Sequence, residues 1–292
     1  MHPWKQIVAP IAAAFLPWPV FADEPAVVDS PEKAVAAQQA AAAKLSKPVE
    51  WGNSIGMKFR LVPAGEFVMG SANGESDEKP HRVRLTQPFY MGCFEITREQ
   101  WETVTGKKHS DYFPGPDVPM NLITWYDATS FIKALNKQEG VEYRLPTEAE
   151  WEFAARAGSA TAFPMGDTEQ ELAKAGWYAG NDGGTLHPVG QKAANAFGLH
   201  DMNGNAWEWC EDFYDAHYYA VSPMENPTGP ALSTYRYRVL RGGAVSFGAK
   251  SCRSTARNYY QDSRTTKFIG FRILLPVATK APAKPNPPPP KK

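Results

Sequence analysis

Residues 197–210 read FGLHDMNGNAWEWC, and this stretch does most to decide the fold. Upstream lies YRLPTEAEWEFAAR at residues 143–156, and downstream lie RGG at residues 241–243 and GFR at residues 270–272. In the upstream segment Thr147 precedes a glutamate by three positions, which is the capping box that begins a helix. We therefore predict a helix at about residues 148–157, with turn-rich and tryptophan-rich coil further on.

The rest of the core contains signals for short helices and short strands. A helix is predicted from Thr97, which begins another capping box, and one more over residues 124–135, where apolar residues recur at helical spacing. Alternating apolar residues predict two strands within residues 57–70 and one over residues 82–90. Glycine, proline, asparagine and aspartate are frequent after the Thr147 helix. Long irregular loops are expected there, and bound calcium is one means of fixing such loops.

The composition indicates a packed globular core with a neutral surface. The chain has 292 residues, with 31 basic and 31 acidic side chains, so its charge gives no reason to expect a nucleic acid or an anionic membrane as partner. A small molecule, a peptide or another protein is the expected partner. Nine Trp, twelve Tyr and fifteen Phe supply core material, and three cysteines allow at most one internal disulfide, with its pairing open.

The N-terminal residues 1–22 have the pattern of a secretory signal peptide. A short basic patch precedes an apolar run that ends in Val-Phe-Ala, and cleavage is predicted after Ala22. A membrane anchor is the alternative, but the run is shorter than the ~20 residues that a bilayer requires and is interrupted by prolines. We therefore predict export to a bacterial periplasm, with no membrane span after cleavage.

Three further regions follow the signal peptide. Residues 23–47 are rich in Ala, Gln, Glu and Lys without large apolar residues, and we interpret them as a solvated spacer. Residues 48–277 form the predicted domain, because no linker composition interrupts them. Residues 278–292 form a Pro/Lys-rich tail without the apolar residues for a core.

Together the quoted segments resemble the formylglycine-generating enzyme (sulfatase-modifying factor) family over about residues 49–276. The resemblance implies a single α+β domain, similar to C-type lectins, with little regular secondary structure. Family members that generate formylglycine hold Cu(I) between two cysteines. Here Phe247 stands where the resemblance places the first thiol, and only Cys252 is available for the second. We therefore do not expect a copper site.

The resemblance also implies a structural calcium site in the segment DMNGNAWE at residues 201–208. The implied ligands are the side chains of Asp201 and Glu208 and the backbone carbonyls of Gly204 and Ala206. A second family site would fall near residues 177–183, where Asn181 and Asp182 are available. The alternative for both is a network of Asx turns without metal.

Catalytic candidates are few. Glu211 and Asp212 are adjacent carboxylates, one of which could have a raised pKa suited to proton transfer, although a solvated acidic face is the alternative. Cys252 is the third candidate, with a buried structural thiol as its alternative. The Trp207-Glu208-Trp209 run is interpreted as core packing.

Arginines inside the matching segments are predicted to be structural clamps with glutamate partners, since a buried guanidinium needs acceptors. They are Arg144, Arg156, Arg241, Arg253, Arg257 and Arg272, with Glu148, Glu150 and Glu152 as nearby candidates.

Three functions stay open from sequence. The chain resembles periplasmic members without the cysteine pair, which oxidise the chromophore of a pyoverdine-type siderophore, so an oxidative tailoring enzyme with a peptide or siderophore-like substrate is favoured. A non-catalytic accessory module for another exported protein is the second possibility. The third is formylglycine generation, which would require Cys252 to meet Cys93 or Cys210.

Overall fold

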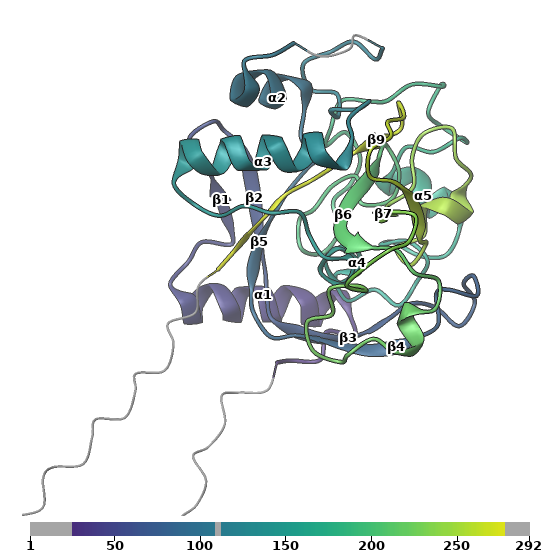
Figure 1. Ribbon diagram of the computed structural model, residues 1–292. Helices are drawn as coiled ribbons and strands as arrows, with labels where there is room; N and C mark the ends of the chain where they lie inside the picture. Colours follow the sequence, from purple (N-terminus) through teal and green to yellow (C-terminus); the bar gives the residue numbers. More distant parts are fainter. Residues whose placement is uncertain (1–24, 109–111, 278–292) are drawn as a thin grey trace, which may run out of the picture.

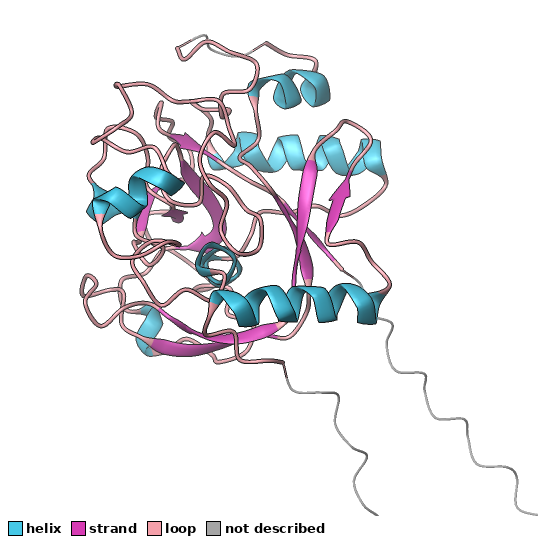
Figure 2. Ribbon diagram, turned by 180° about the vertical axis from the view of Figure 1, so that it is seen from behind, coloured by secondary structure: helices cyan, strands magenta, loops and turns pink. Residues whose placement is uncertain are grey.

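The computed structural model describes residues 25–108 and 112–277. The predicted signal peptide (1–22) and the Pro/Lys-rich tail (278–292) lie outside the described residues. The helices are α1 (Pro31–Leu45), α2 (Arg98–Thr105), α3 (Trp125–Glu139), α4 (Glu148–Arg156) and α5 (Glu169–Ala175), with short 3-10 helices at Tyr218–Ala220 and Ala249–Cys252. This mixture of short elements and long loops confirms the predicted α+β class (Figures 1 and 2).

The first sheet is antiparallel and has the strand order β1-β2-β5-β10. Its strands are β1 (Glu50–Gly52), β2 (Lys58–Val62), β5 (Phe89–Gly92) and β10 (Leu274–Pro276). Strands from both ends of the domain thus pair in one sheet, which lies between α3 and α1 (Figure 1). Because β10 is the last strand, the domain closes only when nearly all of the chain is in place.

A ribbon of two strands and a second four-stranded sheet complete the β structure. The ribbon pairs β3 (Gly65–Met69) with β4 (His81–Leu85). The second sheet has the order β8-β7-β6-β9, and its strands are β6 (Trp207–Phe213), β7 (Tyr237–Arg241), β8 (Asn258–Gln261) and β9 (Ile269–Gly270). The signature residues 207–210 lie in the central strand β6, which explains why they are buried.

The predicted helix starts are confirmed. Thr97, Thr124 and Thr147 each make a capping box at the start of α2, α3 and α4. Each threonine hydroxyl accepts a backbone N–H three residues on, which satisfies a donor that the helix itself leaves free. Helix α3 continues beyond the predicted residue 135 to Glu139 and ends at Gly140, whose positive φ of 69° suits glycine.

Residues 23–47 were predicted to be a solvated spacer, and the structure corrects this. Residues 31–45 form α1, with Ala34, Gln38 and Ala42 buried. The Gln38 amide donates to the carbonyl oxygens of Leu61 (2.7 Å) and Phe197 (3.0 Å). Small alanine side chains allow the helix to lie close to the sheet. The helix packs without large apolar residues, because the buried Gln38 amide hydrogen-bonds to the rest of the domain. The helix is part of the packed domain.

The strand predictions are confirmed in part. The two strands predicted within residues 57–70 are β2 and β3, but they belong to different β structures. The single strand predicted over residues 82–90 is two strands, β4 and β5, interrupted at residues 86–88. Pro88 lies in this interruption, and it lacks the N–H that a continuous ladder would use.

The predicted packing role of the tryptophan run is confirmed. Trp207 and Trp209 are 3% and 0% exposed and contribute to the largest apolar cluster. No helix within residues 25–108 and 112–277 is both long enough and apolar enough to cross a membrane.

Candidate functional site

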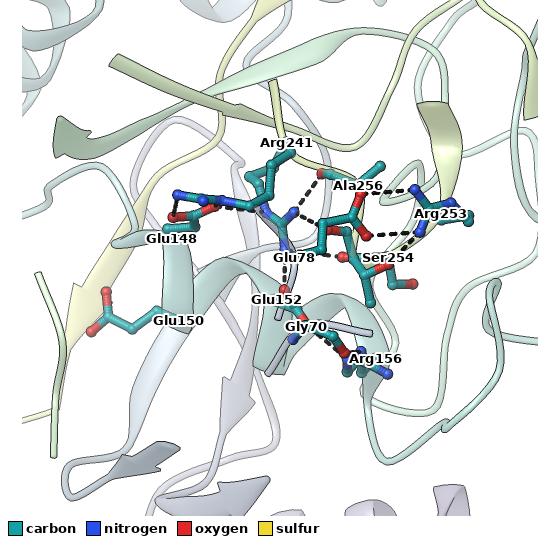
Figure 3. Close-up of polar contacts among 12 residues, drawn as sticks. Gly70, Glu78, Glu148, Glu150, Glu152, Arg156, Arg241, Arg253, Ser254 and Ala256 are labelled. Atoms are coloured by element: carbon teal, nitrogen blue, oxygen red, sulfur yellow. Dashed lines mark hydrogen bonds and ion pairs between the residues drawn. The ribbon is translucent and has the colours of Figure 1, made fainter. Parts of the chain in front are cut away.

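Buried carboxylate–guanidinium pairs organise the centre of the domain (Figure 3). Arg241 from β7 and Glu152 from α4 are both fully buried and form an ion pair. Arg241 also donates to the carbonyl oxygens of Ser254 (3.1 Å) and Thr255 (2.8 Å), and Glu152 accepts from Arg156 Nε at 2.8 Å. Such pairs require several hydrogen bonds to offset desolvation, and these are present.

The remaining predicted clamps are also paired. The Arg257 guanidinium binds both carboxylate oxygens of Glu148, at 2.7 and 2.9 Å. Arg144 binds both oxygens of Glu150, at 2.6 Å each. Arg253 pairs with Glu78 rather than with a nearby α4 glutamate, with both contacts at 2.8 Å. The interpretation of these arginines as structural clamps is confirmed.

Glu208, predicted as a calcium ligand, is the partner of the last clamp. Its Oε2 and Oε1 accept from Arg272 Nε and Nη2, each at 2.7 Å, and Oε2 also accepts from Trp151 Nε1 at 2.8 Å. Both oxygens are engaged and both partners of the ion pair are fully buried. Glu208 is therefore the counter-charge of Arg272, and its role as a calcium ligand stays a prediction.

The rest of the predicted calcium loop lies beside this pair. Asp201 is buried, and its Oδ2 accepts from the Gly190 amide at 2.7 Å while Oδ1 has no partner. Glu95, which sequence reasoning missed, is also buried with both carboxylate oxygens unpartnered. Burial raises the pKa of Glu95 well above its usual range, and the charges of Asp201 and Glu208 add to this effect. Burial also raises the pKa of Asp201 to about 6, with the charge of Glu208 adding to it.

The predicted calcium site combines two side chains with two backbone carbonyls. Among the described residues, no three His, Cys, Asp or Glu side chains are placed to hold a metal ion together. Gly204 and Ala206, the predicted carbonyl ligands, lie in the buried turn that leads into β6. Calcium binding by this loop stays a prediction, with Asp201, Glu208 and the two carbonyls as its donors.

The second predicted calcium loop is held by Asx-type hydrogen bonds. Asn181 Oδ1 accepts from the Tyr178 amide at 2.9 Å. Asp182 accepts from the Gly184 amide at 2.8 Å and from the Ser246 amide. These contacts match the alternative in which side chains and backbone amides fix the loop.

The cysteines are free, buried and packed in separate surroundings. Cys252 lies in a small apolar cluster with Leu172 and Tyr178, whereas Cys210 belongs to the cluster around α4. Burial raises the pKa of the Cys252 thiol to about 12 and that of Cys93 to about 11, so both are protonated near neutral pH. Cys252 thus has the surroundings of a structural thiol, not of a nucleophile or a metal ligand.

The position of the first family thiol is filled by aromatic packing. The Phe247 ring meets Trp207 and Phe268 edge-on, with ring centroids 5.8 and 5.6 Å apart. Cys252 lies instead beneath Gly243, where a side chain on that glycine would overlap its sulfur. Phe247 and Cys252 therefore serve packing in this region.

Glu211 and Asp212 point to different environments, although they are adjacent in β6. Asp212 is 3% exposed, and its Oδ2 accepts from the Glu148 amide at the start of α4 at 2.9 Å. Burial, followed by the charge of Glu148, raises the Asp212 pKa well above its usual range. Asp212 is therefore a helix-anchoring residue that a substrate does not reach.

Glu211 lines a cavity of about 600 Å³ between β6, β7 and the loop at residues 226–231. Partial burial raises the pKa of its carboxyl group, although Arg144 and Arg238 act in the opposite direction. The cavity wall combines these two arginines with apolar side chains such as Leu85 and Phe213. The volume lies within the ~300–1,000 Å³ range of small-molecule sites.

Another cavity, of about 570 Å³, lies between the segment before α1 and the loop after α4. Its arginines are already engaged: Arg82 with Glu66, Arg156 with Glu152, and Arg253 with Glu78. At the Glu211 cavity, in contrast, Glu211 and Arg238 carry charge without an ion-pair partner among the described residues. The Glu211 cavity is therefore the better candidate site.

Comparison with known proteins agrees with the predicted fold. Residues 56–277 match the family of sulfatase-modifying factor enzyme 1-like domains. The chain is 31% identical to the formylglycine-generating enzyme of Streptomyces coelicolor over 82% of this chain and 95% of that protein. It is 31% identical to the serine/threonine-protein kinase pkn1 of Chlamydia pneumoniae over 73% of this chain, but it spans only 37% of that relative.

A solved structure of PvdO from Pseudomonas aeruginosa superposes with a TM-score of 0.72 at 28% identity, covering 79% of this chain and 99% of that one. Residues 56–277, which match the family, include every element from β2 to β10. The chain therefore belongs to the sulfatase-modifying factor (formylglycine-generating enzyme) family.

Proposed function

We propose that the protein is an oxidative tailoring enzyme that acts on a secreted peptide, such as a pyoverdine-type siderophore, without a copper dithiolate. Its likeness to PvdO and its resemblance to the periplasmic family members without the cysteine pair support this proposal. The observation that carries it is the open Glu211 carboxylate at a cavity of ligand size, in a chain whose Cys252 is enclosed by packing.

The proposed step is a two-electron oxidation of the peptide's chromophore ring. A proton leaves a ring N–H or C–H to Glu211, and the substrate then loses a second proton and two electrons to dioxygen. Glu211 then gives up the first proton, so that dioxygen gains two electrons and two protons, becomes hydrogen peroxide and leaves Glu211 ionised. Glu211 needs to be ionised to accept the proton, so its raised pKa makes it a stronger base than an ordinary glutamate. The apolar wall around Phe213 would hold the ring beside the carboxylate.

The setting of the reaction belongs to the same proposal. Cleavage after Ala22 would release the protein into the periplasm, where a secreted peptide would be its substrate. Calcium, if bound at the Asp201 loop, would stabilise the turn that leads into β6 and would take no part in the oxidation.

The test is dioxygen uptake with the unoxidised siderophore peptide as substrate. Replacing the base, Glu211→Gln, should lower the turnover number by about 10²–10⁴-fold, the usual contribution of a general base. The exposed Glu142 provides a matched control, and Glu142→Gln should retain full uptake. In the native protein, turnover should fall as the pH is lowered through the Glu211 pKa, because protonation removes the base.

Full activity of Glu211→Gln would remove Glu211 from the mechanism. Absence of uptake by the native protein, combined with saturable binding of the peptide, would favour the non-catalytic module instead. Oxidation of a sulfatase cysteine by the native protein would restore formylglycine generation.

A further inference from the structure

Arg238 has an unusual position at the Glu211 cavity. It comes from β7, and its guanidinium carbon lies 3.9 Å from the centre of the Trp125 ring and 3.6 Å from that of the Phe213 ring. Such contacts are the geometry of cation–π attraction and fix the orientation of a side chain that would otherwise be mobile. Because the two rings contact the guanidinium, its N–H groups, which point outward along its edge, are the part that can bind a ligand.

Arg238 also lacks an ionic partner. The other arginines of the central network pair with carboxylates, and its neighbour Arg236 contacts Asp262 at 3.0 Å. Among the described residues, Arg238 has no carboxylate within ion-pair distance: its Nη1 donates to the Glu211 carbonyl oxygen, and its buried Nε has no partner. Burial lowers the pKa of its guanidinium, although the charges of Asp262 and Glu211 nearby act in the opposite direction.

The cavity provides room for the missing anion. Arg238 and Glu211 both line it, together with Pro227, Pro230 and Leu85. The planar fork of a guanidinium matches a carboxylate better than it matches any neutral group. Arg144 at the same cavity is already neutralised by Glu150, so it adds little further attraction for an anion.

We propose that Arg238 binds a carboxylate of the ligand, so that this cavity selects acidic peptides in which a carboxylate lies next to an apolar or aromatic group. This inference rests on the proposed function in one respect: the carboxylate would bind in the same cavity as the substrate of the proposed oxidation. It assigns the substrate class: the carboxylate binds at the edge of Arg238, the ring lies against the apolar wall, and the proton donor faces Glu211.

The experiment uses hippurate as probe, because it joins an aromatic ring to a carboxylate, and hippuramide as its uncharged counterpart. Binding is followed by ¹⁹F NMR of protein labelled with 5-fluorotryptophan, with the Trp125 signal assigned from Trp125→Phe. We expect hippurate at millimolar concentrations to shift the Trp125 signal saturably. Hippuramide should bind about tenfold more weakly or worse, as a lost charge-assisted hydrogen bond implies.

Variants separate binding from packing. Arg238→Gln should weaken hippurate binding by about tenfold or more, and Arg238→Lys, which keeps the charge but loses the fork, should give an intermediate value. The exposed Arg264 is the matched control, because it lies outside the cavity, and Arg264→Gln should bind hippurate normally. Circular dichroism of each variant checks that it is folded.

Three results would overturn the inference: no saturable Trp125 shift with hippurate, equal affinity for hippuramide, or undiminished binding by a folded Arg238 variant. The readout needs no turnover. Hippurate binding without any dioxygen uptake would therefore refute the proposed function and leave the carboxylate site intact, and uptake without hippurate binding would do the reverse.

Discussion

Replacing Glu208 with glutamine distinguishes a buried ion pair from a calcium ligand at the family's signature segment. The substitution keeps the size of the side chain but removes the charge that faces the fully buried Arg272. Arg272 would keep its hydrogen bonds to the carbonyl oxygens of Gly92 (3.0 Å) and His200 (2.9 Å), which partly compensate the guanidinium. The glutamine amide also places an N–H group next to the donors of Arg272 and Trp151, where the native protein has a carboxylate oxygen that accepts from them.

Breaking one partner of a buried pair costs about 3–5 kcal/mol, and the remaining carbonyl contacts place Glu208→Gln at the lower end, about 3 kcal/mol. For a domain of this size that corresponds to a decrease of about 6–12 °C in melting temperature. The double variant Glu208→Met/Arg272→Met should be less destabilised than the sum of its single variants, because it leaves no unpaired charge.

The assay is thermal unfolding followed by circular dichroism, in excess EDTA and in excess calcium. The exposed variant Glu142→Gln serves as control and should melt like the native protein in both. The ion-pair account predicts the same loss for Glu208→Gln with and without calcium. A loss that is present in calcium and vanishes in EDTA would refute it, and would identify Glu208 as a metal ligand.

Three further predictions concern stability and thiol reactivity. Gln38→Ala should lower the free energy of unfolding by about 1–3 kcal/mol, because two buried carbonyl oxygens lose their donor; urea titration measures this, and a neutral result would mean that α1 is not packed in solution. Gly158→Ala should cost at least ~1 kcal/mol in the same titration, since φ is +86° and the new methyl would overlap the Ser30 carbonyl oxygen; unchanged stability would contradict that contact. Ellman's reagent at pH 8 should leave every thiol unmodified until the protein unfolds, and rapid labelling of the native protein would show an accessible one, among Cys93, Cys210 and Cys252.

Features that depend on residues close together in the chain were predictable from the sequence. The capping boxes at Thr97 and Thr147 gave correct helix starts, because a cap depends on side chains three positions apart. The helical spacing of apolar residues predicted the helix that begins after Thr124. Helix α1 was missed for the opposite reason. Its stability comes from contacts of Gln38 with Leu61 and Phe197, which the local composition does not reveal.

The candidate site shows the same division. That the arginines are clamped was predictable from the cost of burying a guanidinium, but the partner of Arg253 is Glu78, 175 residues away. Adjacency suggested that Glu211 and Asp212 act together, whereas the alternation of a strand turns one to the cavity and the other to the start of α4. Arg238 carried no local signal, because its significance comes from Trp125, which the fold brings next to it.

Dioxygen uptake by Glu211→Gln compared with Cys252→Ala tests the central claim most directly, that this member of the family works through a carboxylate at the cavity and not through a thiol. With the unoxidised siderophore peptide as substrate, the account predicts a loss of about 10²-fold or more for Glu211→Gln. Cys252→Ala should keep most of the native rate once corrected for the folded fraction. Normal uptake by Glu211→Gln together with abolished uptake by a folded Cys252→Ala would contradict the account.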